Sequence, residues 1–410
     1  MAPFRRLRQV RHRQPSPPRR FSDVGCQLIG LDYLVEEETL PFYEDDQYYP
    51  VRIGEVFKSR YQVVGKLGYG AYSTAWLCRD LSEHKYAALK ISTQLRKYPL
   101  KRRRELSVYE HLSKIRSSHP GQAYIRGLYD GFEISGPHGC HQCLVQPPMH
   151  MSILDMLESN PKPFNAPLLR MVLKCLLTAL DFLHREAGIV HTGRNWKARV
   201  REKLKMTRER FYTSRSFRKP KNDDWGYPVL CDFGEARIGK EHQTGPMIQP
   251  HIYRAPEVTF EMIWGSPIDI WNLGALVWDL FEGEHLFHHL KDERGNYDPF
   301  KHMAQISGFL GLPPTDFILR SETTLQCFDI EGLWEAGEYA KIPTTSLEDV
   351  ETRLEGTDKH QFLLFIRSML KWLPEKQWAY KLCQPTTADQ SHVTTASVDD
   401  NGYVVLSMLF

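Results

Sequence analysis

Apolar and polar side chains alternate in three short runs near residues 59–92, and turn-forming residues separate the runs. Each run is rich in β-branched and aromatic residues, which favours strands over helices. The pattern therefore predicts three antiparallel strands, in SRYQVVGKLGYG, STAWLCRD and KYAALKIS. Further along, HQCLVQ at residues 141–146 predicts another short strand.

Beyond these strands the apolar spacing becomes helical. In KRRRELSVYEHLSKI the apolar residues lie near helical spacing, and PLLRMVLKCLLTALDFLHREAG, after Ala166, keeps that spacing over several turns. Up to about Pro374 the chain continues as helical segments broken by glycine and proline. The predicted fold class is α+β, with a small β-rich lobe at 51–149 and a larger helical lobe at 150–376.

The two ends of the chain follow neither pattern. MAPFRRLRQVRHRQPSPPRRF is rich in arginine and proline, with no acidic residue before Asp23, which predicts a disordered basic arm. A mitochondrial presequence is the alternative, although PSPP would interrupt its amphipathic helix. VEEETLPFYEDDQYYPVRIGEVF predicts an irregular acidic lead-in, so residues 1–50 precede the β-rich lobe. Residues 377–410 predict an irregular tail.

Composition narrows the class of protein. Hydrophobic residues make up 41% of the 410 residues and charged residues 25%, a balance typical of folded globular proteins. A net charge of +3 leaves no large excess of positive charge for holding a polyanion. No run of about 18 uncharged apolar residues occurs, so we expect no membrane span. We expect a monomer.

The eight cysteines are scattered, and no secretory segment follows the start, so we expect reduced thiols and a protein of the cytoplasm and nucleus. Cys140 and Cys143 have the spacing of a zinc-ligand pair, with His138 and His141 beside them. A zinc site normally needs a second ligand pair, which we do not find, so we favour an ordinary hairpin loop.

A glycine-rich sequence, LGYGAYSTA at residues 67–75, lies between the first two predicted strands. Because it joins two strands, it does not fit a dinucleotide-binding turn, which joins a strand to a helix. Backbone amides at Gly68 and Gly70 could approach an anion closely, as in a flap over phosphates. A simple turn is the alternative, since Ser73 occupies the third glycine position.

Two charged residues on apolar elements, Lys90 and Asp232, are candidates for holding phosphates, the first directly and the second through a metal ion. Lys90 ends the apolar strand AALK, where an unpaired charge is unfavourable, and Glu105 on the next helix is the natural partner. A lysine that extends to solvent is the alternative. Asp232 follows the apolar run VLC and precedes a Phe-Gly pair. Since Mg²⁺ prefers one or two carboxylates with phosphate oxygens, Asp232 is a candidate magnesium ligand.

Taken together, these segments resemble the eukaryotic protein kinases over roughly residues 60–375. The ordered set is GYGAYS, AALK, Glu105, DFG, APE and DxWxxG. Longer strings, such as GYPVLCDFGEAR, PHIYRAPEV and DIWNLGALVWDLFEGEHLF, are similar to the SR-protein kinases in their fungal form. That family consists of serine/threonine kinases for Arg/Ser-rich splicing factors.

The resemblance implies a bilobal fold with ATP and Mg²⁺ in the cleft between the lobes. Lys90 would contact the phosphates, Glu105 would orient Lys90, and Asp232 would hold Mg²⁺. Gln146 takes the gatekeeper place, and Asp269 would anchor the catalytic loop through backbone hydrogen bonds. The implied ATP-binding residues are Leu67, Gly68, Tyr69, Gly70, Ala71, Tyr72, Ser73, Ala75 and Lys90, with Pro147 and Met149 at the hinge.

The sequence departs from the family in the catalytic loop. Kinases supply there an aspartate that orients and deprotonates the substrate hydroxyl, and five residues later an asparagine that holds the second Mg²⁺. Here the loop begins as IVHT at 189–192, but Gly193 and Ala198 occupy those two places. Asn195 stands where a phosphate-contacting lysine is expected, and the basic stretch continues through 194–221.

A second departure follows Pro374. The family has an arginine shortly after this proline, and that arginine pairs with the glutamate of the APE sequence, which is Glu257 here. Gln377 stands in its place. If the site is buried, we expect an unpaired Glu257 to destabilise the fold by about a few kcal/mol, because a lone buried charge is strongly unfavourable.

Three interpretations of these departures stay open. The chain is an active kinase whose coding sequence is misread at 193–210 and after 376, or a pseudokinase that binds ATP through Lys90 and Asp232 and acts as a scaffold. Alternatively, residues 194–221 bind RNA or a phosphoprotein. Aromatic residues are sparse there, so we prefer a solvated basic loop and do not expect RNA binding. As written, the chain should transfer phosphate very slowly or not at all, since a general base contributes about 10²–10⁴ in rate.

Overall fold

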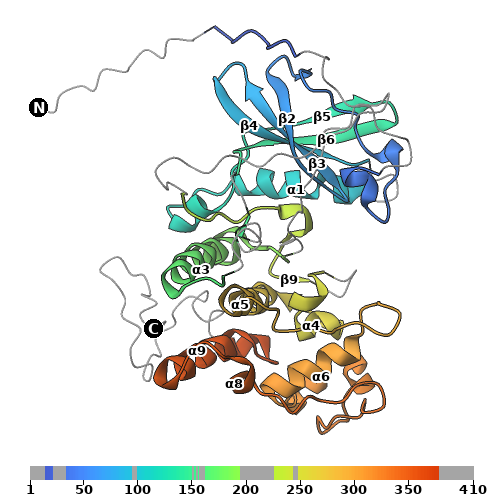
Figure 1. The fold of residues 1–410 in the computed structure, drawn as a ribbon, viewed down its shortest axis with the longest axis vertical. Coiled ribbons are helices and arrows are strands. Elements are labelled where there is room, and N and C mark those ends of the chain that lie inside the picture. Colours follow the sequence, from blue (N-terminus) through green and yellow to red (C-terminus); the bar gives the residue numbers. More distant parts are fainter. Residues whose placement is uncertain are drawn as a thin grey trace, which may run out of the picture. The chain divides into compact units, whose positions relative to one another are not determined.

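A computed structural model describes residues 14–21, 34–94, 99–149, 152–153, 156, 162–193, 226–242 and 248–377. The chain divides into two compact units. The first holds the described residues up to 106 together with 127–149. The second holds 107–126 and the described residues from 152 onward. A β-rich unit and a helical unit give the α+β, bilobal fold that the sequence predicts (Figure 1).

The first unit is built on one six-stranded antiparallel sheet, in the order β1-β2-β3-β4-β6-β5. Its strands are β1 (Val56–Phe57), β2 (Tyr61–Gly70), β3 (Ser73–Asp80), β4 (Lys85–Ser92), β5 (Asp130–Gly136) and β6 (Gly139–Gln146). The four predicted strands are thus confirmed. Trp76, Cys78, Leu89 and Ile91 alternate along β3 and β4, and they form a buried core with residues of β1, β2 and β6.

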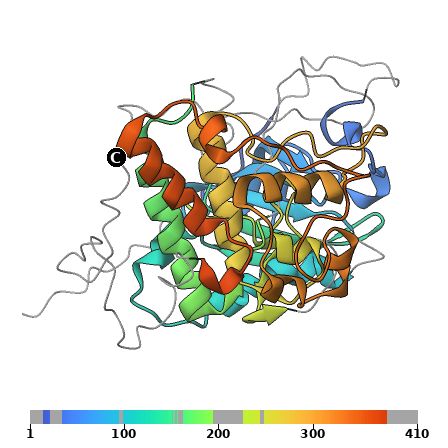
Figure 2. The same ribbon diagram turned by 90° about the horizontal axis from the view of Figure 1, so that it is seen from below.

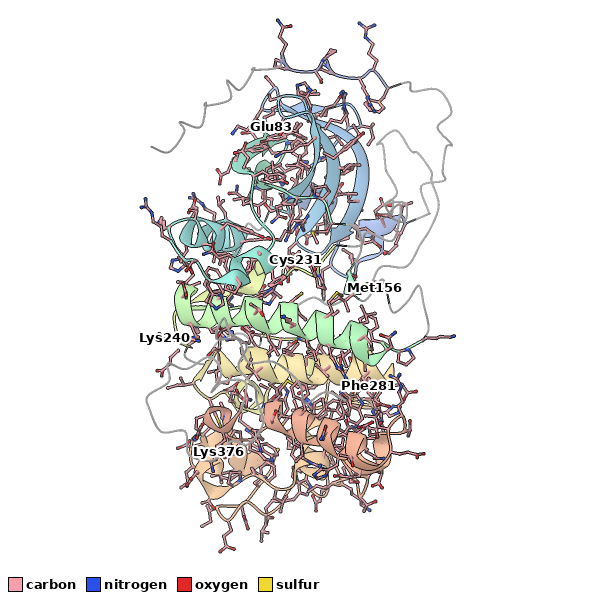
Figure 3. All side chains as sticks on the ribbon, turned by 90° about the vertical axis from the view of Figure 1, so that its left-hand side faces the viewer. Glu83, Met156, Cys231, Lys240, Phe281 and Lys376 are labelled. Carbon is pink, nitrogen blue, oxygen red and sulfur yellow. The ribbon has the colours of Figure 1, made fainter. Side chains whose placement is uncertain are left out.

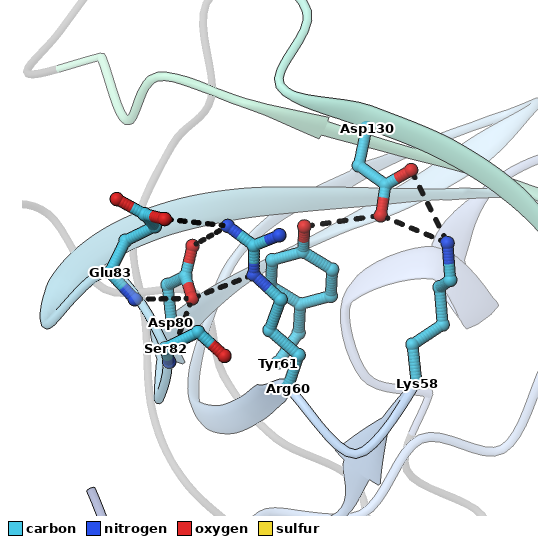
Figure 4. A network of polar contacts seen from close by, with 7 residues as sticks. All are labelled: Lys58, Arg60, Tyr61, Asp80, Ser82, Glu83 and Asp130. Carbon is cyan, nitrogen blue, oxygen red and sulfur yellow. Dashed lines mark hydrogen bonds and ion pairs between the residues drawn. The ribbon is translucent and has the colours of Figure 1, made fainter. Parts of the chain in front are cut away.

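Polar contacts fasten the start of β2 to two other strands (Figure 4). Arg60 makes two hydrogen bonds of 2.8 Å with Asp80 at the end of β3. Asp130, the first residue of β5, lies 3.1 Å from Lys58 Nζ and accepts a hydrogen bond of 3.1 Å from the hydroxyl of Tyr61. Because β5 is the far edge of the strand order, a contact between β2 and β5 requires the sheet to curl.

The segments before the sheet differ in part from the sequence prediction. A disordered arm is predicted over the opening residues, but residues 14–21 are extended against the first unit. The side-chain amide of Gln62 exchanges hydrogen bonds of 2.8 and 2.7 Å with the main chain of Arg19, and Ser16 N donates to Leu81 O at 2.8 Å. A buried amide that matches both backbone groups accounts for this order. Residues 34–55 are an irregular lead-in with two short 3₁₀ turns, as predicted.

The second unit is helical. Its main helices are α3 (Ala166–Asp181), α5 (Pro267–Glu282), α6 (Pro299–Leu310) and α9 (Gly356–Met369), with the short α4 (Pro256–Thr259), α7 (Thr315–Ile318) and α8 (Leu347–Val350). Helix α5 packs against both α3 and α9 (Figures 2 and 3). Every residue of α5 from Ile268 to Phe281 is buried, so this helix is the centre of the unit.

Short connections complete the second unit. Helix α1 (Pro99–Leu112) starts in the first unit and continues into the second from Ser107 onward. Helix α3 passes into a π-helical turn, Phe182–Ala187, that ends at Gly188 in the left-handed region (φ +59°). Strand β7 (Ile189–Val190) pairs with β8 (Arg237–Ile238), and β9 (Glu241–His242) pairs with β10 (Trp264–Gly265).

No helix within the described ranges is long and apolar enough to cross a membrane. The six cysteines in those ranges are free thiols. Cys140 and Cys143 belong to the β5–β6 hairpin, but they lie on strand β6 and not in the loop that the sequence predicts. Over the same residues, no three His, Cys, Asp or Glu side chains gather as a metal site.

Candidate functional site

The glycine-rich sequence forms the hairpin that joins β2 and β3. Gly68 pairs with Ala75 and Gly70 with Ser73, which leaves Ala71 and Tyr72 at the tip. The register shifts between Lys66 and Gly68, an irregularity that interrupts the ladder just before the glycines. Below, residues 67–73 are called the glycine-rich hairpin. The sequence is thus a strand-turn-strand hairpin, which confirms the predicted position between two strands.

Lys90 lies on β4, next to the glycine-rich hairpin in the sheet. It pairs with Ala75 of β3 on one side and with Leu144 of β6 on the other. Its Nζ is 2.6 Å from Glu105 Oε2 on α1, within the first unit. The Glu105 side chain is 10% exposed and that of Lys90 is 24% exposed. The expected ion pair is therefore present, and it fixes a cation on the sheet face that carries Ala75.

The strand that leads to the expected hinge is in register with β4. Gln146 pairs with Ala88, two residues before Lys90, and its side chain is buried. Pro147 and Met149 follow β6 as irregular, half-buried residues. These positions belong to the first unit, together with the glycine-rich hairpin and Lys90.

Asp232 belongs to the second unit and has a left-handed backbone (φ +68°). The next residue, Phe233, is fully buried and packs edge to face against Tyr109 and His191, at centroid distances of 5.4 and 5.3 Å. The ring of His191 also lies 3.1 Å, Nε2 to O, from the carbonyl of Cys231. Packing on both sides of Asp232 thus sets its backbone conformation.

The donor set partly fits magnesium. Asp232 supplies one carboxylate, which together with phosphate oxygens and water is a usual set for Mg²⁺. The place for a second protein ligand, residue 198, is an alanine and lies outside the described residues. When bound, Mg²⁺ would neutralise charge on the phosphates.

Asp269, in the first turn of α5, holds the start of the catalytic loop through hydrogen bonds to its backbone. Its Oδ2 accepts hydrogen bonds from the backbone N of His191 (2.7 Å) and lies 2.9 Å from His184 Nε2, while Oδ1 accepts from Thr192 N (2.8 Å). Asp269 is almost fully buried. The backbone anchoring that the resemblance implies is present in the structure.

The local structure at Gly193 is that of a glycine. Its φ is +27°, and a Cβ added there would lie 2.7 Å from Asn272 Nδ2 on α5. Asn272 Nδ2 also donates to the Gly193 carbonyl at 3.4 Å. Asn195, Ala198 and the rest of the basic stretch 194–221 lie outside the described residues. No carboxylate stands at position 193 to accept a proton from a hydroxyl.

Glu257, on α4, lacks the partner that kinases provide. Its side chain is buried, and neither carboxylate oxygen has a hydrogen-bond partner. Burial raises the pKa of Glu257 to about 7. Gln377 is fully buried, and its side-chain O and N also lack partners. The sequence prediction of an unpaired Glu257 therefore agrees with the structure.

Sequence reasoning missed a second lysine, a buried one, beside the glycine-rich hairpin. Lys66 of β2 is 2% exposed, forms an ion pair with Glu37, and lies 3.5 Å from Glu36. The available signal was a lysine between apolar strand positions, preceded by the acidic run Glu36–Glu38. Their separation in sequence concealed the pairing.

Comparison with known proteins agrees with this geometry. The protein kinase domain family matches residues 220–385. A serine/threonine protein kinase of Aspergillus fumigatus is 40% identical over 388 residues, which cover 92% of this chain and 96% of the relative. Serine/threonine-protein kinase SRPK of Physarum polycephalum is 28% identical over 83% of this chain and 88% of its own length. SRSF protein kinase 3 of Sus scrofa is 34% identical over 43% of this chain and 31% of its own length. The chain belongs to the protein kinases, as a serine/threonine protein kinase of the SR-protein-kinase type.

Proposed function

We propose that this chain binds ATP through the glycine-rich hairpin and Lys90, and that Asp232 holds the accompanying Mg²⁺. The observation that supports this is the 2.6 Å ion pair between Lys90 and Glu105. A lysine held by a carboxylate keeps its charge and a fixed direction, both of which phosphate binding needs. Amides of the hairpin would supply further hydrogen bonds to the phosphates.

Phosphoryl transfer by this chain is proposed to be very slow or absent. Gly193 has no side chain to orient or deprotonate a substrate hydroxyl, and Ala198 cannot bind a second Mg²⁺. Loss of a general base alone lowers rates by about 10²–10⁴. Loss of substrate positioning lowers them further.

The proposed protein substrate, for a chain that carries the missing aspartate, is a serine in an Arg/Ser-rich protein. The names of the relatives in Physarum polycephalum and Sus scrofa support this class. We further propose a monomer of the cytoplasm and nucleus. The free thiols of the six described cysteines are compatible with a reducing compartment.

Two alternative functions concern the ATP-binding residues and the basic stretch 194–221, respectively. As a pseudokinase, the chain would bind ATP without transfer and act as a scaffold. If residues 194–221 instead bind RNA or a phosphoprotein, binding should weaken steeply with salt and disappear when the segment is deleted. Reading the mature transcript across codons 189–222 separates a true Gly193 from a misread coding sequence.

The first prediction is nucleotide-dependent stabilisation. Thermal unfolding of the full chain with Mg·ATP at about 100 times its Kd should show a gain of about 2.7 kcal/mol, because ligand binds only the folded state. Lys90→Met and Asp232→Asn should each abolish most of the gain at the same concentration. Lys85→Met, an exposed lysine on the same strand β4, is the matched control and should leave the gain intact.

A gain that survives in both site variants would place the nucleotide elsewhere. A chelator added to the wild-type protein should reduce the gain, since Asp232 would then face the phosphates without its metal. An assay of transfer to an Arg/Ser-rich peptide completes the test. Turnover within tenfold of the roughly 1–100 s⁻¹ of ordinary kinases would overturn the proposed loss of activity.

A further inference from the structure

The segment that precedes the sheet contacts the glycine-rich hairpin beside its tip. Residues 34–55 are called the strap below. The hydroxyl of Tyr48 donates a hydrogen bond of 3.1 Å to the carbonyl of Gly70, which is the last residue of β2. Gln94, just after β4, donates its backbone N–H to the carbonyl of Gln47 at 2.7 Å. The strap is therefore fixed at 47–48 between the hairpin and the end of β4.

A buried ion pair anchors the same strap at the base of the hairpin. Lys66 Nζ forms an ion pair with Glu37, and the Lys66 side chain is 2% exposed. The ammonium also lies 5.5 and 5.7 Å from the ring centroids of Tyr69 and Trp76. A buried charge needs its partner, so separation of Glu37 from Lys66 is strongly unfavourable. This pair holds the strap on β2 four residues before Gly70.

The chemistry of Tyr48 suits a fixed donor. Burial, followed by the nearby charge of Glu37, raises the pKa of Tyr48, so its hydroxyl stays protonated and can donate. The ring of Tyr48 also packs against that of Tyr43, with centroids 5.1 Å apart. The carbonyl of Gly70 has no side chain of its own residue to limit its motion, and glycine is the most flexible residue. An outside donor therefore restrains the backbone of the hairpin at a glycine.

We propose that Tyr48 is a positioning residue that holds the glycine-rich hairpin in place from the outer side, and that the Lys66–Glu37 pair anchors the strap that carries it. This inference rests on the nucleotide binding proposed above. A hairpin ordered before binding loses less conformational entropy when a nucleoside triphosphate binds, so the strap raises affinity without touching the ligand.

The test compares two tyrosines of the strap in the full chain. Tyr48→Phe removes only the hydroxyl that reaches Gly70. Tyr49→Phe is the matched control, because its hydroxyl donates to Glu55 Oε1 at 2.8 Å, within the strap. Hydrogen exchange of amides 68–73 is measured without nucleotide, and the Kd for Mg·ATP is measured by calorimetry. Tyr48→Phe should speed exchange and raise the Kd by about three- to tenfold, the usual effect of one lost hydrogen bond. Tyr49→Phe should change neither.

The two measurements keep the proposals separate. Unchanged exchange at 68–73 in Tyr48→Phe overturns the positioning role, whatever the Kd. Faster exchange with an unchanged Kd overturns its link to affinity. A wild-type protein that binds no Mg·ATP contradicts the proposed function, while the exchange comparison still decides whether Tyr48 positions the hairpin. Equal effects in both tyrosine variants would show general loosening of the strap, which also overturns the inference.

Discussion

At the scale of single residues, Glu257 is a buried carboxyl group without a hydrogen-bond partner, and its pKa is raised as a result. The charges that act on it, the favourable one of Arg320 and the unfavourable one of Glu375, belong to one ion pair. That pair is formed at 2.6 Å and is largely self-compensating. Gln377 occupies the family's arginine position with its own amide unpaired. Glu257 and Gln377 are thus two buried polar side chains without hydrogen-bond partners, at the positions to which the kinase resemblance assigns an ion pair.

Gln377→Arg should restore the missing pair. The guanidinium can donate to both oxygens of Glu257, which removes an uncompensated buried carboxyl and an unpaired amide. We expect the free energy of unfolding at pH 8 to rise by about 1–3 kcal/mol, measured by chemical denaturation. Gln377→Lys, a point charge without the planar fork, should gain less. Destabilisation by Gln377→Arg would mean that position 377 does not face Glu257.

Residue-level prediction from sequence succeeded where a charge had one possible partner. Lys90 on an apolar strand and Glu105 on the next helix each required compensation, and the structure places them 2.6 Å apart. Lys66 was missed because its partner, Glu37, precedes the sheet in a segment without periodic pattern. Tyr48 lies in the same segment. It was also missed because its hydroxyl bonds to the backbone carbonyl of Gly70, and a contact with backbone cannot be inferred from the type of the partner's side chain.

At the scale of elements, the first turn of α5 organises the chain around the catalytic loop. Asp269 joins three groups: the side chain of His184 in the π-helical turn and the backbone of residues 191 and 192. An ionised carboxylate has only acceptors, so it can satisfy these donors together. This holds the loop start in place even though Gly193 has replaced the catalytic aspartate.

Asp269→Asn should therefore remove part of the hydrogen bonding to His184 and to the backbone of residues 191 and 192. An amide has one acceptor oxygen and one donor nitrogen, so its nitrogen must face a donor that Asp269 now satisfies. We expect a loss of about 1–3 kcal/mol in chemical denaturation, together with faster hydrogen exchange at residues 191 and 192. Glu293→Gln, on an exposed loop, is the control and should stay within about 0.5 kcal/mol of the wild type. An unchanged exchange rate in Asp269→Asn would contradict the anchoring role.

Most helices and strands could be predicted from the sequence, and those that could not were too short or depended on distant residues. Alternation identified β2, β3 and β4, and apolar spacing identified α1 and α3. The two-residue strands β7 to β10 are too short for any periodic signal. The order of residues 14–21 depends on the amide of Gln62, far along the chain, which composition cannot indicate.

At the scale of the whole molecule, the pH dependence of stability depends on buried groups whose pKa values are shifted in opposite directions. Burial raises the pKa of Glu257 from 4.5 to about 7 and lowers that of His302 from 6.5 to about 3. Stability from Glu257 is complete below pH 4.5 and is lost as pH rises through about 7. Stability from His302 is complete above pH 6.5 and is lost as pH falls through about 3. Burial and the nearby Glu351 also raise the pKa of Glu282 to about 7, which adds to the effect of Glu257.

The contributions of Glu257 and His302 to the free energy of unfolding have opposite pH dependence between about pH 4.5 and 6.5. Rising pH removes the stabilisation from Glu257 and restores the stabilisation from His302. Each of the two fully buried groups changes the free energy of unfolding by about 1.4 kcal/mol per pH unit between its two pKa values, so the slopes of Glu257 and His302 nearly cancel between pH 5 and 6.5. Glu282 is only partly buried and adds a smaller decline as the pH rises. The wild-type free energy of unfolding should therefore decline gently from pH 5 to 6.5, decline more steeply from 6.5 to about 7, and level off above pH 7. Chemical denaturation across this range measures it.

Single variants should then expose each slope. Glu257→Gln removes the carboxyl, so stability should rise slightly with pH from 5 to 6.5 and decline less than the wild type between 6.5 and 7. His302→Phe keeps an aromatic ring against Phe287, which His302 now contacts at 5.1 Å between centroids. In that variant stability should fall steadily from pH 5 to about 7 and level off above pH 7. If both variants kept the wild-type profile, the balance would come from other groups, and neither Glu257 nor His302 would titrate between folded and unfolded states as their burial requires.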